Sequence, residues 1–567
     1  MMRKNRRDDS VEKIWLSSYE PGVPESINPE QYDSLGDLIE ESLIKFAPAT
    51  CYVNLGVECS YEKIDHLSQA FAGFLQKTCG LRQGDIVAIV LPNLMQYPVA
   101  MFGALRAGMT VVNVNPLYTA RELKHILHDS GAKCVVILEN FANVLQEILP
   151  ETAVQHIVVT GVGDLLGFKG IFINFAIKHF KKLVPAWNIP DAYNFKETIS
   201  LHHKKAFERV KVKSDDIAYL QYTGGTTGLM KAAVLTHKNM VANVLQGESW
   251  LTPLVNKKGS KGAIITALPL YHIFSLTANC LVFLRTGFPN VLITNPRDLA
   301  GFVNALRRQP FSYMTGVNTL FNALLHNADF RNLDFSHFSF ALGGGMAVQK
   351  AVAQRWQEVT GVPIIEAYGL TETSPAVTIN PLNLKQFNGS IGLPLPSTEV
   401  KICDDQGREV PIGETGELCV RGPQVMQGYW NEPQLTEEVL SPDGWLKTGD
   451  IAKFDQKGFL YLVDRKKDII IVSGFNVYPN EVEDVIAQMK GVREVAIVGV
   501  KSEVHGEIVK AFIVRKDPAL TTRDVIAYCQ QYLAGYKVPK EVEFREELAK
   551  SNIGKILRRA LRDEPKK

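Results

Sequence analysis

The fold class follows from residues 85–114, DIVAIVLPNLMQYPVAMFGALRAGMTVVNV. The apolar run Asp85–Leu91 predicts a buried strand, Tyr97–Arg106 predicts the helix that follows, and Thr110–Val114 predicts the next strand. Strands that alternate with helices in this way are typical of a mostly parallel sheet with helices on both faces. The sequence therefore predicts a doubly wound α/β fold.

The same alternation continues beyond this stretch. We expect a helix over Thr119–His128, a strand over Cys134–Leu138, and further strands over Ile264–Pro269 and Val291–Thr294. One hydrophobic core stops growing at roughly 250–300 residues. A chain of 567 residues is therefore expected to form more than one domain.

A different pattern begins near residue 390. Over residues 390–464, short apolar runs are separated by Gly and Pro turns such as Asp404–Gly407, which predicts a β-rich subdomain. A pattern of strand, helix and strand then begins again. We therefore predict an N-terminal domain over residues 1–466 and a small α+β C-terminal domain over residues 467–567.

The composition excludes several classes of protein. Apolar residues make up 46% and charged residues 22% of the chain, which is an ordinary globular balance. The formal net charge of +2 gives no reason to expect a nucleic-acid partner. The eight cysteines form no C-x-x-C pair, which argues against a zinc site and suits a reducing cytoplasm. No apolar segment follows the charged N-terminus Met1–Ser10, so a secretory signal is not expected.

The segment Gly262–Leu284 has no charged residue and is long enough to span a bilayer. However, Pro269, Tyr271, His272 and Asn279 interrupt it, and polar groups are costly in lipid. We therefore predict a buried strand, loop and helix of a core rather than a spanning helix.

The segment Gly167–Lys182 predicts an amphipathic helix. A helical period places four apolar side chains on one face and two lysines on another: Phe168, Ile171, Phe172 and Phe175 against Lys178 and Lys181. Two interpretations stay open. The helix either packs on the core as a surface helix, or it lies in a membrane interface where its lysines contact anionic lipid heads.

The strongest local motif is YTGGTTGLMK, residues 222–231, which follows the apolar strand Ile217–Leu220. Glycines let a backbone turn tightly and present its N–H groups to an anion, and the threonines and Lys231 add donors and a positive charge. The spacing differs from that of a Walker A loop. We predict a polyphosphate cradle made of Tyr222, Thr223, Gly224, Gly225, Thr226, Thr227, Gly228 and Lys231.

Further motifs follow in order along the chain: Gly343–Met346, Tyr368–Glu372, Thr448–Asp450, Asp464–Asp468, Ser473–Asn476 and Ser551–Lys555. Tyr368 offers a flat ring on which a nucleobase can stack. The carboxylate of Glu372 is a hard oxygen ligand for Mg²⁺, and that of Asp450 can accept hydrogen bonds from both hydroxyls of a ribose. Each motif alone is compatible with a structural role, so their order carries the argument.

This ordered set resembles the adenylate-forming superfamily of acyl-CoA synthetases, adenylation domains and luciferases. Within it, the chain is most similar to bacterial long-chain fatty-acid–CoA ligases, from about Trp15 to Arg562. The similarity includes three more motifs: Asn113–Tyr118, Ala267–Phe274 and Gly316–Phe321. Gly224, Met230 and Ala232 stand where the commoner superfamily pattern has Ser, Pro and Gly.

The resemblance implies a fold and a set of site residues. The implied fold is a large N-terminal domain of two α/β sheets plus a distorted β-barrel, with a small mobile C-terminal lid. The implied cofactor-binding motifs also contain Gly344, Gly345, Gly369 and Thr371. For ATP, the resemblance implies that Thr223–Lys231 bind the phosphates, that Tyr368 borders adenine, and that Asp450 and Arg465 hold the ribose. It implies that Glu372 and Thr226 bind Mg²⁺ and that His272 lies beside the acyl pocket. In the C-terminal part of the chain, it implies that Lys467 is the hinge, that Gly474 lines the pantetheine tunnel and that Lys555 is the catalytic lysine.

The implied activity is the ligation of a fatty acid to coenzyme A with ATP, through an acyl-adenylate. A fatty acid is already ionised at neutral pH, so its attack on ATP needs no general base. The obstacle is repulsion between anions, which Mg²⁺ and lysine charge relieve. Two alternatives are a ligase that loads an acyl-carrier protein and a fatty-acid-binding protein without catalysis.

The resemblance also carries expectations about the setting of the enzyme. The product would enter fatty-acid degradation by β-oxidation. We expect a cytoplasmic protein that is partly peripheral on the inner face of the cell membrane. Related ligases are often homodimers, so self-association is a further expectation.

Overall fold

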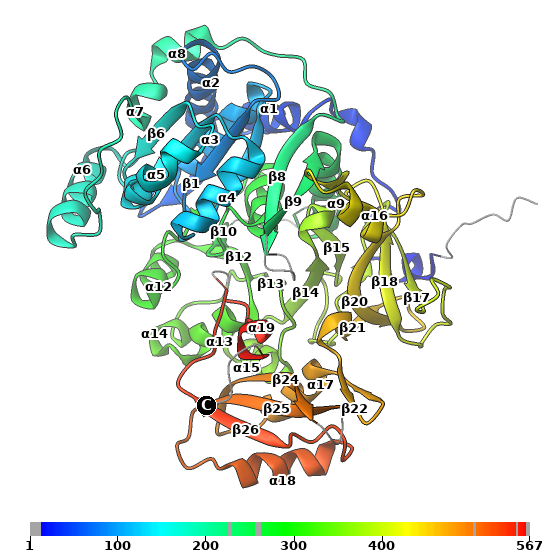
Figure 1. Ribbon diagram of the computed structural model, residues 1–567. Helices are drawn as coiled ribbons and strands as arrows, with labels where there is room; N and C mark the ends of the chain where they lie inside the picture. The colour runs from blue at the N-terminus through cyan, green and yellow to red at the C-terminus, as the bar shows by residue number, and fades with distance from the viewer. Residues whose placement is uncertain (1–12, 225–229, 256–261, 503–505, 552–553, 563–567) are drawn as a thin grey trace, which may run out of the picture.

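The computed structural model describes residues 13–224, 230–255, 262–502, 506–551 and 554–562. These residues form a large N-terminal domain and a smaller C-terminal domain that lies against one end of it (Figure 1). Both domains combine helices and strands, which confirms the predicted α/β class.

One sheet of the large domain contains the stretch that begins at residue 85. Its strands β3 (Ile86–Val90), β4 (Thr110–Asn113) and β5 (Cys134–Leu138) pair in parallel, and α3 (Gln96–Arg106) and α4 (Ala120–Ser130) connect them. Helix α4 begins at a capping box between Thr119 and Glu122 and ends at Gly131, whose φ of 68° suits a glycine. The sheet has eight strands in the order β19 (Gly428–Tyr429), β9 (Met230–Thr236), β8 (Ile217–Gly224), β4 (Thr110–Asn113), β3 (Ile86–Val90), β5 (Cys134–Leu138), β6 (His156–Thr160) and β7 (Tyr193–Asn194).

The second large sheet has nine strands, with parallel pairing at its centre. Helices α12 (Leu299–Arg308), α13 (Asn318–His326) and α15 (Lys350–Thr360) alternate with its strands. The order is β16 (Leu393–Pro394), β15 (Ala376–Ile379), β14 (Ile364–Gly369), β13 (Phe340–Gly343), β12 (Phe311–Gly316), β10 (Ala263–Thr266), β11 (Asn290–Leu292), β1 (Thr50–Asn54) and β2 (Val57–Ser60).

The uncharged segment 262–284 lies within this sheet and the core beside it. After β10 the chain enters a helical run made of α10 (Ile273–Ser275), the π-helical η6 (Leu276–Leu281) and α11 (Val282–Leu284). Most of its side chains are buried in the main core, which confirms the predicted strand, loop and helix. No helix among the described residues is long and apolar enough to cross a membrane.

The predicted β-rich segment contributes to three sheets. Strands β17 (Glu399–Cys403), β18 (Gly416–Arg421), β20 (Leu446–Phe454) and β21 (Leu460–Arg465) form an antiparallel sheet with β17 and β21 at its edges. The short strand β16 instead joins the nine-stranded sheet, and β19 joins the eight-stranded sheet beside β9. The β-rich segment therefore connects the two large sheets.

The strands that follow the short 3-10 turn η8 (Lys466–Asp468) form the separate sheet of the small domain. Its sheet has the strand order β23 (Phe475–Val477), β22 (Ile470–Val472), β25 (Gly506–Arg515) and β24 (Val492–Ser502), with β26 (Glu541–Arg545) paired to β25. Helices α17 (Pro479–Ala487) and α18 (Thr522–Tyr532) pack with it around a separate core. The eight cysteines of the chain are all buried and unbridged.

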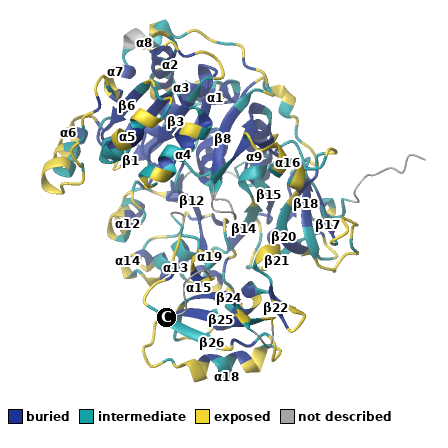
Figure 2. Cartoon of the chain, viewed as in Figure 1, coloured by how far each residue is buried: buried dark blue, intermediate teal, exposed yellow. Residues whose placement is uncertain are grey.

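The amphipathic segment forms α6 (Gly167–Phe175), which continues as the π-helical turn η5 (Ala176–Phe180). It contacts the core through Ile173 and Ile177. The face formed by Phe168, Ile171, Phe172 and Phe175 is exposed instead, and Phe168 keeps 86% of its surface accessible. Figure 2 shows much of α6 in the colour of exposed residues. The helix therefore packs on the core through Ile173 and Ile177, as the first interpretation expected, while its larger apolar face stays exposed and leaves the membrane interpretation open.

Candidate functional site

A cavity of about 1870 Å³ lies where both large sheets, the β-rich sheet and the small domain meet. Strand β14 contributes Tyr368, β20 contributes Asp450, and the last part of the small domain contributes Lys555. Most predicted site residues line this one cavity: Tyr222, Thr223, Lys231, His272, Gly344, Gly345, Tyr368, Gly369, Thr371, Glu372, Asp450, Arg465, Lys467 and Lys555.

Part of the cavity lining is apolar. Lining residues from α9 (His237–Val255), from the helical run 273–284 and from β13 include Trp250, Leu251, Phe274, Val282, Phe283, Phe340 and Leu342. Such a surface suits a hydrocarbon chain, and the rest of the lining includes charged and polar side chains.

The glycine- and threonine-rich motif joins β8 to β9 as an antiparallel hairpin. Thr223 pairs with Lys231 and Gly224 pairs with Met230, while Gly225, Thr226, Thr227 and Gly228 lie outside the described residues. Ala232 continues β9, is buried, and accepts a hydrogen bond on its carbonyl from the N–H of Trp430 at 2.9 Å. Its methyl group is therefore accommodated within the strand.

Lys231 contacts Tyr429, and Tyr429 in turn contacts Glu372, although the three residues lie far apart in the sequence. The Nζ atom of Lys231 lies 3.8 Å from the ring centroid of Tyr429, and the hydroxyl of Tyr429 donates a 2.7 Å hydrogen bond to Oε1 of Glu372. Burial lowers the pKa of Lys231, and the charge of Glu372 opposes that shift. An ammonium and a carboxylate that face one cavity can hold a polyphosphate and its divalent cation.

Glu372 has the chemistry that a magnesium site requires. Mg²⁺ is usually held by one or two carboxylates together with substrate phosphates and water. Glu372 borders the cavity beside Thr371, so its hard oxygens fit that donor set. Among the described residues, no cluster of three or more His, Cys, Asp or Glu side chains forms an all-protein metal site.

A second cluster of polar side chains surrounds Asp450, of which only 3% is exposed. The hydroxyl of Tyr368 donates a 2.6 Å hydrogen bond to Oδ2 of Asp450, and Nε of Arg465 lies 3.3 Å from Oδ1. Asp450 and Arg465 are paired directly across β20 and β21. A carboxylate fixed from both sides is well placed to accept bonds from vicinal hydroxyls.

Three glycines of the predicted motifs, Gly344, Gly345 and Gly369, line the cavity. A Cβ on Gly369 would come within 2.0 Å of the carbonyl oxygen of Pro375, so only glycine fits there. Gly345 has a φ of 76°, and a Cβ on Gly344 would lie 3.1 Å from the ring of Phe274. Thr371 begins the 3-10 turn η7 (Thr371–Thr373) at the cavity wall.

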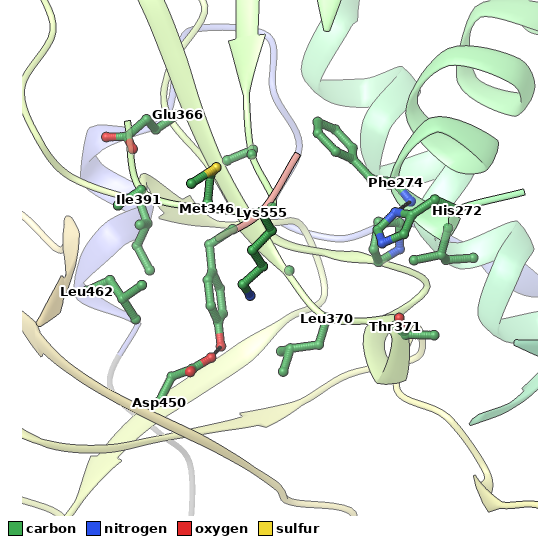
Figure 3. Close-up of a pocket in the computed structure, with 18 of the residues that line it drawn as sticks. His272, Phe274, Met346, Glu366, Leu370, Thr371, Ile391, Asp450, Leu462 and Lys555 are labelled. Atoms are coloured by element: carbon green, nitrogen blue, oxygen red, sulfur yellow. Dashed lines mark hydrogen bonds between the residues drawn. The ribbon is translucent and has the colours of Figure 1, made fainter. Parts of the chain in front are cut away.

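Lys555 projects into the cavity between Asp450 and His272 (Figure 3). Burial lowers the pKa of Lys555 to about 7, and the nearby positive charge of Arg465 adds to this shift. Burial also lowers the pKa of His272 to about 4, with a further contribution from the charge of Lys555. Nδ1 of His272 accepts a 3.3 Å hydrogen bond from the N–H of Phe274 at the start of α10. His272 is therefore a neutral side chain at neutral pH.

The last two predicted positions differ in their location, because Lys467 lines the cavity and Gly474 does not. Lys467 is in η8 at the cavity wall, and burial and Arg465 lower its pKa. Gly474 lies in the exposed turn between β22 and β23, with a φ of 85°, and a Cβ at this position would have no other atom within 4 Å. It does not line the cavity in this arrangement of the two domains.

Sequence reasoning missed three residues at the cavity. Glu366 is two positions before Tyr368 on β14, so it shares a face of the strand, and the strand's period of two could have revealed it. Burial raises the pKa of Glu366 to about 8, and its Oε1 accepts a 2.9 Å bond from the N–H of Val348. Tyr429 and Arg558 also line the cavity, but no local motif connects them with it.

Comparisons with known proteins agree with this geometry. Residues 39–430 match the AMP-binding enzyme family, and residues 481–555 match the AMP-binding enzyme C-terminal domain. A long-chain-fatty-acid–CoA ligase of Salmonella typhimurium is 54% identical over 555 residues, which cover 98% of each chain.

Solved structures extend the similarity to the whole fold. The anthranilate CoA ligase AuaEII in complex with anthranoyl-AMP superposes with a TM-score of 0.82 at 25% identity, covering 94% of this chain and 98% of its own. ATP-bound MatB from Rhodopseudomonas palustris superposes with a TM-score of 0.80 at 26% identity, covering 93% and 98%.

Proposed function

The chain belongs to the AMP-binding enzyme family, and on that premise we propose that it is a long-chain fatty acid–CoA ligase. The reaction converts a fatty acid, ATP and CoA into acyl-CoA, AMP and diphosphate through an acyl-adenylate. The observation that carries the proposal is one cavity whose lining combines apolar side chains with Lys231, Glu372, Asp450 and Lys555.

In the first step, the fatty-acid carboxylate attacks the α-phosphorus of ATP and diphosphate leaves. The carboxylate is ionised at neutral pH, so no protein group has to remove a proton. The reaction instead needs positive charge where two anions approach, and fixed charges in a water-poor cavity provide it. Lys231 and Lys555 supply that charge, because the phosphates of bound ATP favour the protonated form of Lys555 against the burial that lowers its pKa. Neutral His272 borders the acyl group without adding to the charge.

The nucleotide is held by the remaining polar side chains. Residues Thr223–Lys231 bind the phosphates, the ring of Tyr368 borders adenine, and Asp450 with Arg465 holds the ribose. Support for the last role comes from the contacts that fix Asp450 on two sides. Glu372, together with Thr226, would hold Mg²⁺, which neutralises phosphate charge when it is bound.

In the second step, the CoA thiol attacks the acyl-adenylate and AMP leaves. We place the domain boundary after Lys466 and the hinge at Lys467, about which the small domain turns between the steps. The proposed role of Gly474 at the pantetheine arm requires this rotation, because Gly474 does not line the cavity in the present arrangement of the domains. The acyl-CoA product then enters fatty-acid degradation.

The exposed face of α6 supports peripheral contact with the inner face of the cell membrane. Phe168, Ile171 and Phe172 are each more than half accessible, and Phe180 and Leu183 extend the apolar surface. Lys178 and Lys181 are exposed beside it, so anionic lipid heads complement the surface in charge. Such contact would place the enzyme where its apolar substrate dissolves.

One assay tests the activity against its alternatives. AMP release is measured with ATP and CoA over a series of saturated acids from acetate to stearate, with thioester and diphosphate recorded in parallel. CoA-dependent AMP release that is greatest for long acids supports the proposal. Diphosphate release without a CoA thioester would instead indicate a ligase that loads a carrier protein, and lipid retention without diphosphate release would indicate a binding protein.

A further inference from the structure

Arg558 lies three residues beyond Lys555 and contacts both sides of the hinge. Its Nη2 is 2.7 Å from Oε2 of Glu483, which belongs to the small domain. Its Nη1 is 3.3 Å from Oδ1 of Asp464, which belongs to β21 before the hinge. The Arg558 side chain is 17% exposed, so these are largely desolvated ion pairs.

Asp464 is the fixed partner in this arrangement. Its side chain is completely buried, and its two oxygens accept backbone N–H groups from opposite sides of the hinge. Oδ1 accepts from Arg465 and Oδ2 accepts from Asn480, both at 2.8 Å. Asp464 belongs to β21, which is paired with β20 of the large domain, so it stays with that domain when the small domain moves. Its contacts with Arg558 and with Asn480 are then both made only in this orientation of the lid, and the Arg558–Asp464 pair reports that orientation.

The segment that carries Lys555 is attached to the large domain at a second point. Oγ1 of Thr319, in α13, donates a 3.2 Å hydrogen bond to the carbonyl oxygen of Gly554. A Cβ on Gly554 would lie 2.5 Å from Oγ1 of Thr319, so the approach is close. Lys555 is thus bracketed by a contact on its preceding residue and an ion pair three residues after it.

We infer that Arg558 is a positioning residue for adenylation, whose ion pair with Asp464 across the hinge holds Lys555 in the cavity. The inference rests on the proposed function. The bond from Arg558 to Glu483 lies within the small domain and persists when the lid turns, whereas the pair with Asp464 must break. Arg558 therefore stays aligned on its own domain and can re-form the pair when the lid returns.

The alternative is that Arg558 only stabilises the small domain. The two roles differ in which half-reaction they affect, because a positioning role matters only while Lys555 is needed. If the pair biases the lid toward the adenylation orientation, losing it lowers the fraction of competent enzyme in that step alone. A purely stabilising role would affect both half-reactions alike.

The test measures acyl-AMP formation from ATP and palmitate, and separately acyl-CoA formation from supplied palmitoyl-AMP and CoA. Arg558→Gln is expected to lower the first rate about tenfold or more and to leave the second nearly unchanged. Arg558→Lys should restore part of the first rate. Asp464→Asn removes the charge on the other side of the hinge. Like Arg558→Gln, it should lower the rate of acyl-AMP formation and leave the rate of acyl-CoA formation nearly unchanged. The matched control is Arg523→Gln, on the exposed surface of α18, which should change neither rate.

Equal retention or equal loss of both half-reactions in a folded Arg558→Gln protein would overturn the inference. If that variant does not fold, Asp464→Asn decides between the same two outcomes. Failure of the proposed function is distinguishable, because the unmodified protein would then form no palmitoyl-AMP at all.

Discussion

The hydroxyl of Tyr368 donates a 2.6 Å hydrogen bond to the buried carboxylate of Asp450, 82 positions later in the chain. This bond connects the ring proposed to border adenine with the carboxylate proposed to hold ribose. It also orients Asp450 before any nucleotide arrives. The two motifs are therefore parts of one binding surface.

Tyr368→Phe should weaken ATP binding without affecting CoA. The substitution keeps the ring but removes a hydrogen bond to a charged group, which contributes on the order of 1.5–3 kcal/mol. We expect the KM for ATP to rise about tenfold or more. Tyr461→Phe is the matched control, because its hydroxyl lies 3.4 Å from Asp455 and outside the cavity. An unchanged KM for ATP would contradict the proposed nucleotide surface.

Lys555→Ala should separate the two half-reactions. Its charge is needed while the carboxylate approaches ATP and not when a thiol attacks the finished adenylate. Acyl-AMP formation should fall by roughly 10² or more, the scale seen when one preorganised charge-stabilising group is lost. Conversion of supplied acyl-AMP should stay near normal, and Lys540→Ala on the exposed surface serves as control. Equal loss in both steps would count against a mobile lid.

Gly474→Leu should block thioester formation more than adenylation. In the present arrangement a side chain at this position meets open space, so ATP and acid still bind. After the lid turns, the same side chain would obstruct the pantetheine arm. Gly407→Leu controls for backbone strain, since Gly407 has a similar φ of 77° in an exposed turn. If the two variants behave alike, the tunnel assignment is wrong.

Glu366→Gln should flatten the dependence of stability on pH. Burial raises the pKa of Glu366 to about 8, whereas an unfolded glutamate titrates near ~4.3. Between these values the folded protein binds a proton that the unfolded chain does not, so the free energy of unfolding decreases as pH rises toward 8. In thermal melts, the Tm of the Glu366→Gln variant should therefore decrease less than that of the unmodified protein as the pH rises over this range. Glu358→Gln, at an exposed position of α15, is the control and should show the same dependence of Tm on pH as the unmodified protein. If Glu366→Gln also shows an unchanged dependence, the raised pKa of Glu366 is refuted.

Lys178→Glu combined with Lys181→Glu should weaken binding to anionic vesicles. Each basic residue near such a surface contributes about 1 kcal/mol, and the exchange also adds repulsion. Co-sedimentation with phosphatidylserine vesicles should fall about tenfold or more, and activity on soluble short-chain acids should not change. A double exchange at Lys457 and Lys516, which are exposed elsewhere, is the control. Unaltered co-sedimentation of the α6 variant would exclude this surface.

Local periodicity predicted the repeating part of the fold. The helix and strands expected over 97–106, 110–114 and 134–138 appear as α3, β4 and β5 with almost the same bounds. Their periods of apolar residues depend on near neighbours only. The pairing of β19 with β9 could not be predicted, because two residues of the β-rich segment carry no such period.

The candidate site was predictable where one motif holds several of its residues. Tyr368, Gly369, Thr371 and Glu372 occur together and line the cavity together. Tyr429 and Arg558 were missed because their partners, Lys231 and Asp464, lie far away in the chain. Such contacts follow from the packing of whole elements, which no local pattern encodes.

The burial of all eight cysteines makes the protein suitable for fluorescence labelling. A thiol reagent reaches accessible thiolates, and burial in apolar surroundings keeps cysteines inert. Single cysteines introduced at exposed Glu414 in the large domain and Asn476 in the small domain would thus accept a donor and an acceptor dye in an otherwise natural background. Energy transfer between them would follow the proposed lid rotation in real time, one turnover after another.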